Sequence, residues 1–144
     1  MRCFLAFILT LALSVPLNAQ NGNIDSLKIA LRSAQGKARA KVLLELCWQL
    51  RFSNADTART YGLAALDLAR QLNETDLEGA ALNYIGITHE AQGNYTDALS
   101  FELKALEMAR KSGDEAKTAR LLNDIGIVHD EKGDWQKALE YYYE

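Results

Sequence analysis

Two histidines, each followed by an acidic residue, are the side chains of this chain best suited to chemistry. His89-Glu90 and His129-Asp130 each place an imidazole, which ligates metals and titrates near neutral pH, next to a carboxylate. The zinc-binding helix of a metalloprotease needs a second histidine four residues after the first, and the stretch after His89 lacks it. We expect both histidines to fill helix-packing positions, with metal binding or pH sensing as the alternative.

No other group of residues suggests an active site. The chain has no G-x-S-x-G nucleophile motif and no glycine-rich phosphate loop. Cys47 lies on an apolar helical stripe, which predicts a buried core residue rather than a reactive thiol. We therefore expect no enzyme activity, no cofactor and no metal site. The net charge of −3 and the lack of a basic run argue against nucleic acid as a partner.

The segments that carry the histidines are repeats of one another. Residues 82–89 return forty positions later as residues 122–129. Between 82–104 and 122–144, nine of twenty-three aligned positions are identical. A fixed period of this size predicts a solenoid, in which each repeat buries its apolar face on its neighbours.

Sixteen positions carry the repeat: Leu82, Ile85, Gly86, His89, Gly93, Tyr95, Ala98 and Ala105, then Leu122, Ile125, Gly126, His129, Gly133, Trp135, Ala138 and Tyr142. The series resembles the tetratricopeptide repeat (TPR) pattern W-x2-L-G-x2-Y, A-x3-F, A and P. This resemblance implies an all-α, right-handed superhelical solenoid of antiparallel helix pairs. Three features depart from the family: the period of forty, the missing closing proline, and histidine in place of tyrosine.

The resemblance divides the chain into segments. A polar start and a short helix, from Ile24 to about Gln35 and ending at Gly36, are expected in residues 20–36. The repeats are expected at 37–73, 75–113 and 115–144, the last of them incomplete. We also expect the aromatic residues of the repeats to lie mainly in the solenoid core, namely Tyr84, Tyr95, Trp135 and Tyr141 to Tyr143.

Glycine positions indicate how the helices pack and turn. Glycine costs a helix interior about 0.5–1 kcal/mol, so Gly86 and Gly126 predict close approach of a neighbouring helix. Gly93 and Gly133 are expected to end the first helix of each pair in the left-handed conformation.

Short polar residues are expected to cap the second helices. Asn94 and Asp134 follow the turn glycines, and a side-chain oxygen at this position accepts a hydrogen bond from the first helical turn. Ser53-Asn54 is expected to do the same in the first repeat.

Residues 1–19 have the order of a secretory signal peptide. Arg2 provides the basic start, an apolar run extends to Leu17, and Ala19 offers a small residue for cleavage. The apolar run is short for a membrane span, although an uncleaved anchor is the alternative. We expect an exported protein, periplasmic or secreted after cleavage.

The TPR resemblance implies a binding groove lined by the first helix of each repeat. Stacked asparagines could pair with the backbone of an extended peptide, or they could join neighbouring helices. The carboxylate clamp of chaperone-binding TPR domains is not expected, because Tyr84 and Asp124 stand where it needs asparagine. The predicted groove residues are Asn83, Ile87, Glu90, Asn123, Ile127 and Asp130.

The function expected from the resemblance is a scaffold that binds a protein or peptide partner, without membrane contact by the repeats. The alternative is the sensory region of a longer membrane-bound signalling protein, such as a histidine kinase, with its catalytic part beyond Glu144. Repeat three stops before the equivalent of residues 105–110, so we expect the sequence to be part of a longer chain.

Overall fold

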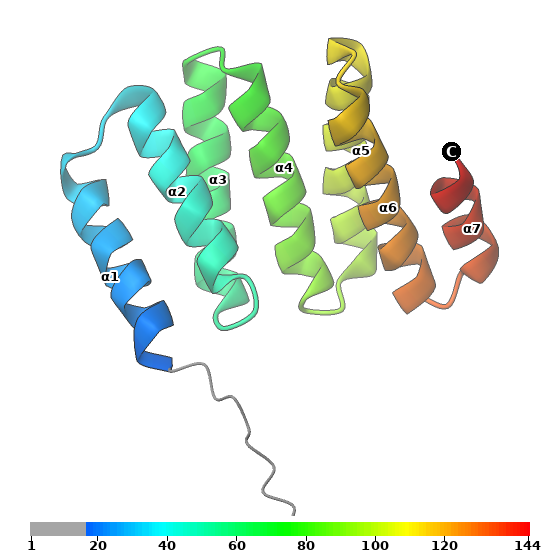
Figure 1. Cartoon of the computed structure of the whole chain (residues 1–144), viewed down its shortest axis with the longest axis horizontal. Helices are drawn as coiled ribbons and strands as arrows, with labels where there is room; N and C mark the ends of the chain where they lie inside the picture. Colours follow the sequence, from blue (N-terminus) through cyan, green and yellow to red (C-terminus); the bar gives the residue numbers. More distant parts are fainter. Residues whose placement is uncertain (1–16) are drawn as a thin grey trace, which may run out of the picture.

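Seven α-helices follow one another along residues 17–144, the part of the chain that the computed structural model describes. Figure 1 shows them standing side by side in chain order, from α1 at one end to α7 at the other. The helices are α1 (Leu17–Ser33), α2 (Gly36–Leu50), α3 (Ala55–Gln71), α4 (Thr75–Glu90), α5 (Tyr95–Ser112), α6 (Glu115–Glu131) and α7 (Trp135–Tyr143).

Three helix pairs, α2–α3, α4–α5 and α6–α7, build the molecule. Helices α4 and α6 begin at Thr75 and Glu115, and α5 and α7 begin at Tyr95 and Trp135, so each start recurs forty residues later. Each helix packs mainly on the helices next to it in the chain. The fold is the predicted all-α, right-handed superhelical solenoid of antiparallel helix pairs.

Small and branched apolar residues fill the contacts between the helices. Ala58, Ala98 and Ala138 occupy equivalent positions in the second helices, and all three are buried. Ile85 and Ile125 are fully buried in the first helices. Full burial of such a branched side chain contributes about 1.5–3 kcal/mol, so the repeated pattern accounts for the stacking of the pairs.

The helical glycines lie where the helices come closest, as predicted. A Cβ atom added to Gly86 would lie 2.7 Å from Cγ of Glu102 and 3.2 Å from the carbonyl oxygen of Ala98. One added to Gly126 would collide with the ring of Tyr142. The second helix of each pair therefore occupies the space that a side chain at the glycine would need.

The turns within the second and third repeats also match the prediction. Gly93 and Gly133 have φ angles of 72° and 84°, in the left-handed region that glycine tolerates. In the first repeat, Asn54 caps α3 by accepting a hydrogen bond from the backbone N–H of Thr57 at 3.1 Å.

The capping prediction for Asn94 and Asp134 is wrong. Neither side chain accepts a hydrogen bond from the first turn of its helix. The carboxylate of Asp134 instead lies 3.6 Å from Nδ1 of His129 and 3.4 Å from Nζ of Lys137, which draws it away from the helix end. Nothing in the structure explains the orientation of Asn94.

The N-terminal helix is longer than predicted. Helix α1 begins at Leu17 rather than at Ile24, and Gly36, with φ +52°, begins α2 instead of ending the preceding helix. Most of the predicted signal peptide lies outside the described residues, so its cleavage stays a prediction. Among the helices of residues 17–144, none combines the length and hydropathy that a membrane span requires.

The aromatic residues only partly follow the prediction of a buried core. Tyr84, Tyr95 and Tyr141 pack against the core. Trp135, Tyr142 and Tyr143 are exposed, by 70%, 43% and 85%, so placing them in the core was wrong. All three belong to α7, which packs mainly on α6 and buries little besides Ala138.

Candidate functional site

The first helices of the three repeats are not evenly spaced. Helix α2 contacts α4 directly, and the rings of Trp48 and Tyr84 fill the space between them, with centroids 5.1 Å apart. At the next junction Ile87 and Asp124 take the equivalent positions, and α4 and α6 are spread apart (Figure 1). We call the space between α4 and α6, with α5 as its floor, the α4–α6 groove.

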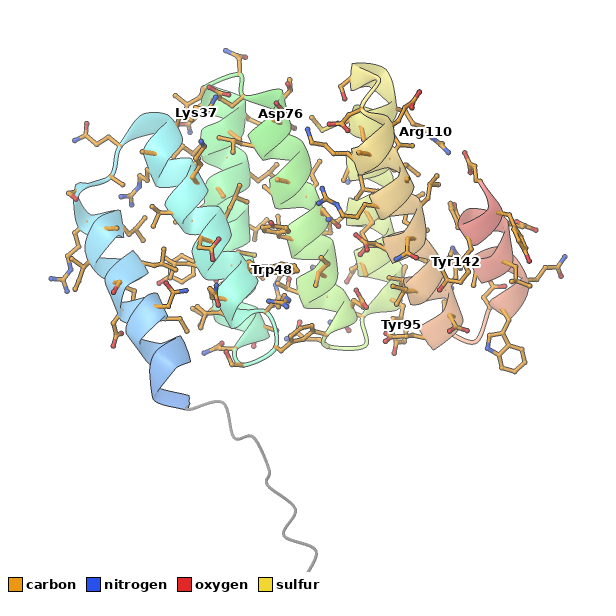
Figure 2. All side chains as sticks on the ribbon, in the orientation of Figure 1. Lys37, Trp48, Asp76, Tyr95, Arg110 and Tyr142 are labelled. Carbon is orange, nitrogen blue, oxygen red and sulfur yellow. The ribbon has the colours of Figure 1, made fainter. Side chains whose placement is uncertain are left out.

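A pocket of about 90 Å³ opens in this groove. Small residues leave room for it, since Gly79 and Ala80 of α4 and Ala105 of α5 are among the residues that line it. At one end, Nζ of Lys117 on α6 lies 2.8 Å from the carboxylate of Asp76 on α4. Figure 2 shows Asp76 on the same edge of the row of helices, uppermost in this view, as Lys37 and Arg110. The remaining lining residues are Thr75, Asn83, Tyr84, Met108, Ala109, Ser112, Arg120 and Leu121.

Asn83 is the polar group best placed to act in the pocket. Its side chain is only 7% exposed, and its Oδ1 atom has no hydrogen-bond partner among the described residues. Burial raises the pKa of Asp124, and a hydrogen bond from the side chain of Asn83 offsets part of this rise. An unpaired buried acceptor costs about 1–3 kcal/mol, so a donor entering the pocket would recover this energy.

Three carboxyl groups, one from each helix of the groove, lie further along it. Burial and the charges of Glu90 and Asp124 raise the pKa of Glu102 to about 8. Burial, Glu131 and Asp124 raise the pKa of Glu90 to about 7. Glu102 is fully buried, and both of its carboxyl oxygens lack hydrogen-bond partners in the described part of the chain. We call Glu90, Glu102 and Asp124 the carboxyl cluster.

The histidines fill packing positions, as predicted. His89 stacks on Phe101, and His129 stacks on Tyr141, with ring centroids 5.5 and 5.4 Å apart. Burial lowers the pKa of both imidazoles. No group of three or more histidine, cysteine or acidic residues within 17–144 is arranged to hold a metal ion.

The predicted groove residues fall into two sets. Asn83, Ile87 and Glu90 lie on α4 and are buried or half-buried, whereas their repeat equivalents on α6 are exposed. Asn83 interacts with Asp124, and Asn123 instead lines a second pocket beside Tyr141 and Tyr142. The equivalents on α6 are Asn123, Ile127 and Asp130.

Sequence reasoning missed Glu102. The A-x3-F part of the repeat pattern runs from Ala98 to Glu102 in the second repeat, and from Ala138 to Tyr142 in the third. A carboxyl group at a position that the pattern gives to an aromatic residue was a readable signal. Lys117 and Arg120 were also missed, because they precede the part of α6 that matches the pattern.

Comparison with known proteins settles the family. A sequence model of the tetratricopeptide repeat matches residues 49–111 and 78–144. The chain belongs to the tetratricopeptide repeat family. Together the matched TPR residues run from the end of α2 to the last residue of the sequence. No curated protein is significantly similar to this TPR chain in sequence.

Two solved TPR-like structures share the fold. The TPR domain of Arabidopsis FLU superposes with a TM-score of 0.69 at 23% identity, covering 75% of this chain and 92% of that domain. A Rap protein complexed with competence and sporulation factor superposes with a TM-score of 0.71 at 21% identity. That match covers 87% of this chain and 34% of the Rap chain, so the present chain spans about a third of the Rap protein.

Proposed function

We propose that this TPR chain is an interaction scaffold that binds an extended peptide segment of a partner in the α4–α6 groove. The observation that carries the proposal is the pocket beside Asn83, where an apolar floor meets a buried amide oxygen without a partner among the described residues. An apolar side chain of the peptide fits against Ala80, Ala105 and Met108, and a backbone N–H donates to Oδ1 of Asn83.

The dimensions of the pocket suit one side chain rather than a large ligand. About 90 Å³ is smaller than the 150 Å³ engineered cavity that takes up benzene. A single aliphatic residue therefore matches the pocket, while the rest of the peptide lies along the open groove. The Rap protein of similar fold, solved in complex with competence and sporulation factor, is consistent with ligand binding by such a solenoid.

We place this binding on the concave face of the superhelix, where the first helices of TPR repeats lie. We also propose that the protein is exported, on the strength of the leader pattern in residues 1–19. A sensory region of a longer signalling protein would use the groove in the same way. Sequencing the gene beyond Glu144 separates the two forms, since the sensor requires a membrane-spanning segment and a catalytic domain there.

Selection from a random octapeptide library displayed on phage tests the proposal. The purified chain should retain a family of related peptides, and Ala80→Phe should abolish their binding by filling the pocket. Ala64→Phe, at an exposed position of α3, is the matched control and should bind as the unchanged chain does. Retention of no peptide family, or equal binding by Ala80→Phe, would overturn the proposal.

A further inference from the structure

The carboxyl cluster has no cation to balance it fully. Its members lie close enough to interact electrostatically. The charges of Glu90 and Asp124 raise the pKa of Glu102, and the charge of Asp124 also raises the pKa of Glu90. Among the described residues, Arg120 is the one cation that counteracts burial at any of the three, and it acts on Asp124. No residue in the described part of the chain forms an ion pair with Glu90 or Glu102 within 4 Å.

Glu102 lies inside the contact between α5 and α4. Its carboxyl group is fully buried against α4, where Oε1 lies 3.2 Å from the position that a Cβ of Gly86 would take. Both oxygens lack partners within residues 17–144, so burying them costs free energy that no contact of the described chain returns. The group therefore has unused capacity to bind a donor.

The position is particular to the second repeat. Its equivalents are Gly62 in α3, which faces Cys47, and Tyr142 in α7, which faces Gly126. Neither equivalent carries a charge. The repeat that contains the open pocket is thus the one in which a carboxyl group replaces an apolar or aromatic residue at this contact. Packing alone would be served better by the aromatic ring, so the carboxyl group points to a ligand.

We propose that the carboxyl cluster binds the ammonium or guanidinium group of a lysine or arginine side chain in the bound peptide. This inference rests on the proposed function and specifies the kind of side chain that the bound peptide carries. A cation bound by the cluster would form charge-assisted hydrogen bonds with the oxygens of Glu102, which lack partners among the described residues, and would balance the charges of Glu90 and Asp124.

The fold also sets the spacing of the recognised residues. Ala80 at the pocket and Gly86 beside Glu102 are six residues apart on α4, which is about 9 Å of helix. An extended peptide covers this distance in about three residues. The predicted motif is an apolar residue with a basic residue about three positions away.

The peptides retained in the octapeptide selection provide the test. We expect them to carry lysine or arginine at one fixed distance from an apolar residue. Replacing that basic residue by norleucine should weaken binding to the unchanged chain by roughly tenfold, measured by fluorescence anisotropy. The same replacement should have little effect on binding to Glu102→Gln or to Glu90→Gln. Glu107→Gln, an exposed position on the same helix, is the matched control and should behave as the unchanged chain.

The outcomes separate this inference from the proposed function. A retained peptide family without a preferred basic position, or an equal norleucine effect in the unchanged chain and both cluster variants, would overturn the inference alone. Retention of no peptide family would overturn both. Glu90→Gln is included because Glu90 is only half-buried, so this variant stays informative even where Glu102→Gln perturbs folding, as followed by circular dichroism.

Discussion

Gly86 and Glu102 share one site in the contact between α4 and α5, because the glutamate side chain occupies the space beside the glycine Cα. Cγ of Glu102 lies 2.7 Å from the position of a Cβ added to Gly86. The absence of a side chain on α4 thus allows α5 to place a carboxyl group inside the solenoid. The same pair therefore fixes the packing of α4 on α5 and supplies the carboxyl group of the proposed cation site.

Alanine substitution at two glycines of α4 should have opposite effects on stability. Gly86→Ala should destabilise by about 1–3 kcal/mol through overpacking, partly offset by about 1 kcal/mol of helix propensity. Gly79→Ala meets no atom within 4 Å and should stabilise by up to about 1 kcal/mol. Urea unfolding of both variants measures the difference. A stabilised Gly86→Ala chain would mean that α4 and α5 do not approach as described.

Stability should fall as pH rises from about 6.5 to 8.5. The folded chain raises the pKa of Glu102 to about 8 and that of Glu90 to about 7 from an ordinary 4.5, so it binds protons that the unfolded chain has released. This stabilisation is fully present at a pH below the pKa of the unfolded chain. It is lost as the pH rises through the pKa of the folded chain. Every tenfold gain in proton affinity on folding corresponds to about 1.4 kcal/mol, so the loss of stability between pH 6.5 and 8.5 is of the order of a few kcal/mol.

Other titrating groups define the window for this experiment. The pKa values of His89 and His129 are lowered, so their contribution is lost as pH falls below 6.5 and does not oppose the trend above it. The pKa of Cys47 is raised to about 12 from 9.0, which affects stability mainly above pH 8.5. Thermal unfolding from pH 6.5 to 8.5 should show a smaller slope in Glu102→Gln, and an unchanged slope would contradict the assignment.

Asn83 and Asn123 occupy equivalent repeat positions but should differ in binding. Asn83→Ala removes the unpaired acceptor of the pocket. The affinity for a selected peptide should fall by roughly tenfold, which corresponds to the loss of about 1.4 kcal/mol of hydrogen bonding. Asn123→Ala, at an exposed position, should have little effect. Anisotropy titrations measure both, with circular dichroism as the folding control. Equal losses would favour a ladder formed by both asparagines.

Cys47 should be inert in the folded chain. Burial raises the pKa of its thiol to about 12, and the thiolate is the reactive form. In a chain with Cys3 replaced by serine, a disulfide reagent should label Cys47 only after unfolding in guanidinium. Rapid labelling of the folded chain would show that the contact between α2 and α3 opens easily.

The repeat pattern predicted the helix pairs because its glycines and alanines have direct steric roles. Gly126 faces Tyr142, and Ala98 is buried, as their spacing required. The pattern failed for Asp134, whose carboxylate is drawn to His129 and Lys137 by charge interactions that span the turn. Ion pairing and helix capping compete for this carboxylate. The outcome depends on which charged groups lie close in space, and the alignment of one repeat on another does not reveal this.

The candidate site was less predictable than the fold. Asn83 was identified from its repeat position, but the pocket beside it arises because α4 and α6 are spread apart while α2 and α4 are joined by Trp48 and Tyr84. That asymmetry depends on which aromatic residues face each other across two helices. Glu102 could not be predicted from the residues that fit the pattern, because it departs from the aromatic residue that the pattern has at this position.

The most direct test of peptide binding in the α4–α6 groove is an NMR titration of the isotope-labelled chain with a selected octapeptide. We predict that the largest shift changes fall on the side-chain amide of Asn83 and on the backbone amides of Gly79, Ala80, Glu102 and Leu121. Residues of α1 and the exposed side of α3 should change little. Shift changes concentrated on the exposed face of α7 around Trp135 and Leu139, with none at Asn83, would contradict the account.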